Sequence, residues 1–135
     1  GASVTPATPA GESPEEKAAK ARAAAAKKEQ DEAAAKAAAE AQAKAEAKLY
    51  DEQENRFDHM SARAAAMKTS YDTLKNQQAA AGYSPNQDLT MAVAAMGQFM
   101  ARAEAALAAH DGASAQKYMD KAEPQIEILE RKFGR

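Results

Sequence analysis

The 135-residue chain has no cysteine and no tryptophan, and aromatic residues make up only 5% of it. The absence of cysteine excludes disulfide bonds, thiolate metal ligands and cysteine nucleophiles. Most of the 45% hydrophobic content is alanine, which buries little surface. Apart from Val4, the larger apolar residues occur from Leu49 onward. Only the C-terminal part of the chain can therefore form a substantial core.

The chain also lacks an excess of charge of either sign. It has 18 basic and 20 acidic residues, for a net charge of -2. This balance gives no overall attraction to nucleic acid or to an anionic membrane. The sequence contains no apolar run of the roughly 20 residues that a membrane span requires. At this length we expect one domain with an appendage.

The first segment, residues 1–12, contains two Thr-Pro pairs, Thr5-Pro6 and Thr8-Pro9, followed by Gly11. This composition predicts a disordered linker of the kind that separates a folded module from an anchor or another domain. A frayed chain terminus would explain the same pattern.

A helix start follows the linker. Ser13 and Glu16 match the Ser-x-x-Glu capping box, and Pro14 suits the first helical position. No proline or glycine follows until Gly82, whose left-handed backbone would end the helix. The sequence therefore predicts one helix over residues 14–81.

Residues 13–48 form the N-terminal part of this helix, here called the arm. The arm is built almost wholly of alanine, lysine, glutamate and glutamine, which have high helix propensity. Charges alternate in sign every four residues, and each such pair adds roughly 0.2–0.5 kcal/mol to helix stability. This charge ladder comprises Lys28, Glu32, Lys36, Glu40 and Lys44. The arm should be helical in water without a partner.

Residues 49–135 contain three apolar seams at helical spacing, which predict a bundle core. The first seam comprises Leu49, Gln53, Phe57, Met60, Ala64, Met67, Tyr71 and Leu74, with Gln53 as its one polar member. The second comprises Leu89, Val93, Met96, Met100, Ala103, Leu107 and His110. The third comprises Ala115, Tyr118, Met119, Ala122, Ile126, Leu129 and Phe133. We expect an all-α antiparallel three-helix bundle with a greatly extended first helix.

Turn residues give the expected limits of the second and third helices. Ser84 is the predicted cap of the second helix, with Gln87 in the place of the capping-box glutamate. Gly112 is interpreted as a helix stop, and the third helix should begin near Ala113. Pro124 should bend that helix near Asp120.

The sequence carries no recognisable catalytic or metal-binding pattern. Its two histidines, His59 and His110, belong to no Glu-x-x-His or His-x-x-x-His pair. No serine lies in a Gly-x-Ser-x-Gly elbow, and no glycine-rich phosphate loop is present. We therefore expect a non-enzymatic protein with no catalytic, cofactor-binding or metal-binding residues.

The methionines and the arm supply the candidate contact residues. Five of the six methionines occupy seam positions, whereas Met91 lies off the seam and is a candidate exposed contact. In the arm, self-pairing through alanine would use Ala35, Ala38 and Ala45. Alternatively, five basic side chains at the start of the arm would bind an anionic surface or nucleic acid. These cations are Lys17, Lys20, Arg22, Lys27 and Lys28.

The alternation of alanine with lysine, glutamate and glutamine over residues 27–48 resembles the helical spacer of TolA-type proteins, which cross the bacterial periplasm. Separately, the run from Ala105-Ala106-Leu107 through Asp111-Gly112 to Ala122-Glu123 resembles bacterial tetratricopeptide-like helical hairpins. The first resemblance implies a structural role in the bacterial cell envelope or periplasm.

Two functions remain open. The chain is expected to be a structural or interaction module, a rigid spacer or assembly element that links protein partners and associates weakly with itself through the arm. The alternative is a peripheral binding module that uses the basic start of the arm. The absence of Trp, Phe and Leu there favours the first function over lipid binding.

Overall fold

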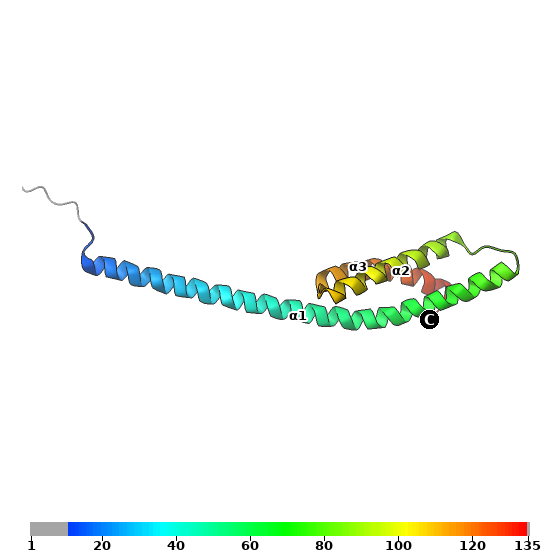
Figure 1. Ribbon diagram of the computed structural model, residues 1–135, viewed down its shortest axis with the longest axis horizontal. Helices are drawn as coiled ribbons and strands as arrows, with labels where there is room; N and C mark the ends of the chain where they lie inside the picture. The colour runs from blue at the N-terminus through cyan, green and yellow to red at the C-terminus, as the bar shows by residue number, and fades with distance from the viewer. Residues whose placement is uncertain (1–10, 135) are drawn as a thin grey trace, which may run out of the picture. The chain divides into compact units, whose positions relative to one another are not determined.

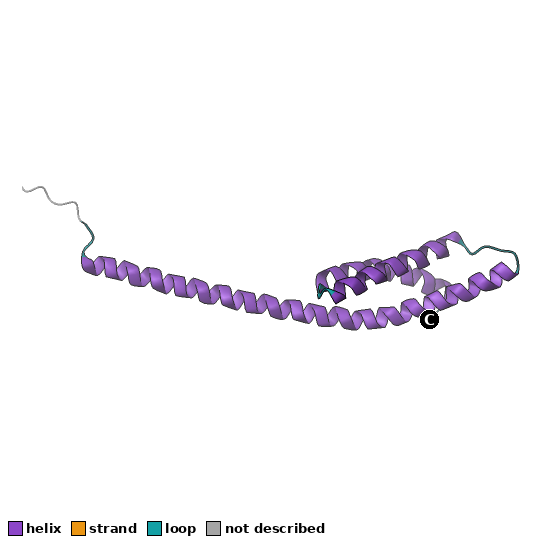
Figure 2. Ribbon diagram, in the orientation of Figure 1, coloured by secondary structure: helices purple, strands orange, loops and turns teal. Residues whose placement is uncertain are grey.

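The computed structural model describes residues 11–134, which form three helices (Figure 1). These are α1 (Pro14–Ala80), α2 (Gln87–Ala108) and α3 (Gly112–Phe133). No strand occurs among the described residues (Figure 2). The predicted fold, an all-α antiparallel three-helix bundle with a greatly extended first helix, is confirmed. The predicted linker at residues 1–12 lies outside the described residues except for Gly11 and Glu12.

The chain divides into two units between Ala43 and Lys44, although α1 is continuous through this point. In the first unit, residues 14–43 are a single run of helix in which every side chain is exposed. In the second unit, the remainder of α1 packs with α2 and α3 around a shared core. The large apolar residues found late in the sequence explain why the core formed by residues 11–134 lies in the second unit.

The core of the second unit combines a few large side chains with alanine. Met60, Met119, Ile126 and Leu129 are the largest fully buried side chains. Three alanines, Ala103, Ala115 and Ala122, are fully buried between them, where a small side chain lets the helices approach closely. The seam methionines are buried as predicted, so they act as core residues.

The expected cap of α1 is confirmed, whereas the expected cap of α2 is wrong. The backbone N–H of Glu16 donates to Ser13 Oγ at 3.1 Å. At α2, however, the capping residue is Asn86, whose Oδ1 accepts from the Asp88 N–H at 2.7 Å. Asn86 has an extended backbone, with φ -56° and ψ 130°, so the helix cannot begin before Gln87. Ser84 therefore lies too far from the helix to cap it.

The interpretation of Gly112 as a helix stop is also wrong. His110 adopts the left-handed conformation after α2, with φ 54°. Asp111 then caps α3, and Gly112 is the first residue of α3. A Cβ atom on Gly112 would lie 3.0 Å from the Tyr50 nitrogen and 3.3 Å from the Leu49 carbonyl carbon. Glycine avoids a tight contact at this position, because α3 begins directly against the backbone of α1.

Two further features of the core depart from an ideal bundle. Gln53 is only 6% exposed, and its side-chain oxygen has no hydrogen-bond partner in the described part of the chain. The polar member of the first seam is therefore buried at a cost in stability. α3 is helical through Pro124. The expected bend near Asp120 stays a prediction.

Candidate functional site

The exposed arm is the first candidate surface. Its charge ladder repeats every four residues, and each step turns about 40° around a helix of 3.6 residues per turn. Between Lys28 and Lys44 the charges therefore move roughly 160° around α1. The charges of the ladder are therefore spread over nearly half of the circumference of the arm, as in a helix that is stable when surrounded by water.

The five predicted basic contacts do not all lie on one face of the arm. From the helical repeat, the four lysines at 17, 20, 27 and 28 lie within an arc of about 100°, and Arg22 points to the opposite side. Lys20 is also paired with the carboxylate of Glu12. The structure thus leaves four of the predicted cations as a common basic face, which we call the lysine face.

The predicted alanine contacts are exposed, and two of the three share a face. Ala38 and Ala45 are seven residues apart, which places them on the same side of α1. Ala35 is turned about 60° away from Ala38. Two alanines that were not predicted as contacts, Ala34 and Ala41, lie on the same side of α1 as Ala38 and Ala45, at spacings of four and three residues. That spacing was the signal that could have identified them.

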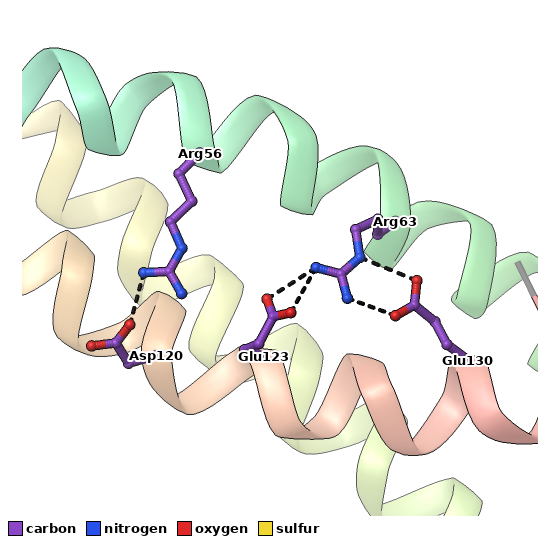
Figure 3. Close-up of polar contacts among 5 residues, drawn as sticks. All are labelled: Arg56, Arg63, Asp120, Glu123 and Glu130. Carbon is purple, nitrogen blue, oxygen red and sulfur yellow. Dashed lines mark hydrogen bonds and ion pairs between the residues drawn. The ribbon is translucent and has the colours of Figure 1, made fainter.

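In the second unit, a cluster of charged side chains joins α1 to α3 (Figure 3). Arg63 Nη1 donates to both carboxylate oxygens of Glu123, at 2.9 and 3.0 Å. Its Nε and Nη2 atoms donate to Glu130 at 3.1 and 2.6 Å. Two helical turns earlier on α1, Arg56 Nη1 donates to Asp120 Oδ1 at 2.8 Å. Sequence reasoning missed this cluster, although Arg56 and Arg63 are seven residues apart and so share a face.

The ion pairs of this cluster stabilise the charged form of Arg63. The hydrogen bond to Glu130 is the main cause of the raised pKa of Arg63, and Glu123 contributes in the same direction. Desolvation opposes them without reversing the shift. Arg63 therefore stays charged at any accessible pH and has no proton to transfer. The Glu130 side chain is only 7% exposed, and the two hydrogen bonds from Arg63 stabilise its buried charge.

The two histidines, His59 and His110, are both exposed, and the His110 ring packs against the Tyr50 ring in a tilted arrangement with ring centroids 4.5 Å apart. The Tyr50 hydroxyl donates to Glu54 at 3.0 Å, and this hydrogen bond is the main cause of its raised pKa. Among residues 11–134, no group of three potential ligands could hold a metal ion. None of the helices in this range is long and apolar enough to cross a membrane.

The bundle exposes two large apolar side chains near its α1–α2 loop. Met91 is 61% exposed, as expected for a residue off the seam, and Tyr83 is 71% exposed. Sequence reasoning missed Tyr83, which lies in the loop rather than in a seam. The contact predicted for Met91 stays a prediction.

No family model, curated protein or solved structure matches this chain. The TolA-type and tetratricopeptide-like resemblances therefore stay predictions based on a few residue patterns.

Proposed function

We propose that the protein is a non-enzymatic structural module in which the arm is a rigid helical spacer attached to a small helical bundle. The observation that carries this proposal is the uninterrupted helix at residues 14–43, whose side chains are all exposed. Such a helix gains nothing from packing within its own chain. Its length and composition are explained if its task is to hold two attachments at a fixed separation.

The physical properties of the segment support this role. Residues 14–43 span about 45 Å as a helix, at roughly 1.5 Å per residue. The segment exceeds the roughly 12–15 residues below which isolated helices are marginal in water. A flexible coil of the same length would have a root-mean-square span of only about 30 Å, with wide fluctuation. The helical form therefore gives both greater reach and a defined distance.

The resemblance to TolA-type spacers supports the same role and suggests a place in the bacterial envelope. Under this proposal the bundle and any segment joined to the arm would each contact a protein partner. The arm would also associate weakly with other copies of itself.

Pulsed electron paramagnetic resonance can test the spacer role, because the chain has no cysteine that would compete for labels. With spin labels at Ala18→Cys and Ala43→Cys, we expect a narrow distance distribution near 37 Å, from a rise of about 1.5 Å per residue. Ala34→Pro provides the control, because proline in the helix interior should broaden the distribution. A broad distribution without the proline would refute the spacer role.

The lysine face supports a second candidate function, binding to an anionic surface. Replacing Lys17, Lys20, Lys27 and Lys28 by alanine should abolish binding to phosphatidylserine vesicles and to duplex DNA. Arg22→Ala should have little effect, because Arg22 lies on the opposite side of the arm. Binding should also weaken steeply with added salt. Equal effects of Arg22→Ala and the lysine replacements would exclude a specific face.

A further inference from the structure

One row of residues along α1 carries charges in an order that is complementary to the same row of a second copy running in the opposite direction. Its positions are spaced alternately four and three residues apart, which keeps them on one side of a helix. The row, here called the alanine row, comprises Lys27, Asp31, Ala34, Ala38, Ala41, Ala45, Lys48 and Glu52. All eight residues are exposed. The row therefore has four alanines at its centre and a lysine–acid pair at each end.

The order of charges along this row favours one arrangement of two copies. In an antiparallel pair centred between Ala38 and Ala41, Lys27 lies opposite Glu52 of the second copy. Asp31 then lies opposite Lys48 of the second copy, and alanine lies opposite alanine. In a parallel pair in register, all four charged positions would face a residue of the same charge. The unlike contacts of the antiparallel pair would attract, and the like contacts of the parallel pair would repel.

The positions that flank the row agree with the antiparallel arrangement. In an antiparallel pair, Lys28 would lie beside Leu49 of the second copy, and Ala37 beside Lys44. Gln30 would lie beside Asp51. None of these contacts brings like charges together, and a charged residue meets an apolar or an amide side chain in each case.

We propose that the alanine row is a docking surface for a second copy of this chain, arranged antiparallel. The proposal rests on the proposed function as an assembly element and defines how two copies meet. Alanine lets two helices approach to the short end of the 8–10 Å range of interaxial distances. Because alanine buries little area, association is weak, and the charged ends determine its direction.

Cysteine cross-linking distinguishes the antiparallel from the parallel arrangement. A disulfide requires Cα atoms less than about 7 Å apart. Ala34→Cys mixed with Ala45→Cys should form a disulfide-linked heterodimer under mild oxidation, because the two positions face each other. Neither variant should cross-link alone, because its two copies of the cysteine would be about 16 Å apart along the axis. Efficient cross-linking of each variant with itself, without the mixed product, would overturn the proposal.

Charge reversal tests the role of the row ends in the protein without cysteines. Lys48→Glu turns both Asp31–Lys48 contacts of the dimer into repulsive ones and should weaken association at least about tenfold. The variant with both Lys48→Glu and Asp31→Lys restores unlike charges and should recover most of the loss. Sedimentation equilibrium over a concentration series measures both effects. Failure of the double variant to recover association would overturn the charge assignment.

The spin-label distance within one chain separates this proposal from the spacer role. If the chain remains monomeric at every concentration while the label distance stays narrow, the docking surface is refuted and the spacer role stands. If the distance distribution is broad, the spacer role fails whatever the state of association. Monomer at all concentrations therefore counts against this inference alone.

Discussion

The close approach of α3 to α1 at Gly112 gives a prediction with an internal control. In Gly112→Ala, the added methyl group would lie 3.0 Å from the Tyr50 nitrogen and 3.1 Å from its Cα atom. Both are backbone atoms, which cannot rotate away, so the start of α3 must move outward. Overpacking of this kind costs about 1–3 kcal/mol.

Gly97 is the matched control for this substitution. It lies in the interior of α2, and a Cβ atom there would meet nothing within 4 Å. Gly97→Ala should therefore stabilise the bundle by about 0.5–1 kcal/mol, because alanine has the higher helix propensity. The same change in residue type is thus predicted to have opposite signs at two sites in one unit.

Urea unfolding followed by tyrosine fluorescence measures both effects. All four tyrosines lie at or after Tyr50, so their signal reports on the second unit and not on the arm. We expect the midpoint to fall for Gly112→Ala and to rise for Gly97→Ala, with similar slopes. If Gly112→Ala were as stabilising as Gly97→Ala, the close packing of α3 on α1 would be refuted.

Three other substitutions test polar groups of the bundle. Arg63→Met should lower the free energy of unfolding by about 2–4 kcal/mol, because it removes the two hydrogen bonds that Arg63 donates to the buried carboxylate of Glu130; an unchanged urea midpoint would contradict this. Gln53→Met should stabilise by about 1–2 kcal/mol, because it removes a buried oxygen that lacks a partner. A fall in stability would show that the amide is bonded. The hydrogen bond from the Ser114 hydroxyl is the main cause of the lowered pKa of Asp111, and the hydrogen bond from the Ser114 N–H acts in the same direction. The Asp111 carboxylate therefore stabilises the fold above its unfolded pKa of about 3.9. This contribution is lost as the pH falls through the lower pKa of the folded state. Asp111→Asn keeps the cap but should remove that part of the acid dependence, measured as the unfolding midpoint between about pH 5 and pH 2.

The architecture could be predicted from the sequence because it depends on periodicity. The seam containing Met60 and Met67 requires a packing partner, and the absence of proline and glycine between Pro14 and Gly82 predicts one continuous helix. These features are local and repeat along the chain, so several residues support each conclusion. The exposure of Met91 followed from the same periodicity.

The details that could not be predicted depend on the tertiary approach of one element to another. Gly112 resembles a helix stop in sequence, and only the position of the Tyr50 backbone shows why it must be glycine. Ser84 and Asn86 are both good caps, and the path of the short loop decides between them. The partners of Arg63 lie about sixty residues away in sequence, so heptad spacing can suggest a shared face but cannot pair the residues.

The central claim is that residues 14–43 form a helix that needs no partner. Backbone carbon-13 chemical shifts of the intact chain test this most directly, at a dilution where sedimentation shows only monomer. The claim predicts helical shifts for every alanine from Ala18 to Ala43. Random-coil shifts in the middle of the arm, which become helical only as the concentration rises, would contradict it and show that the helix depends on association.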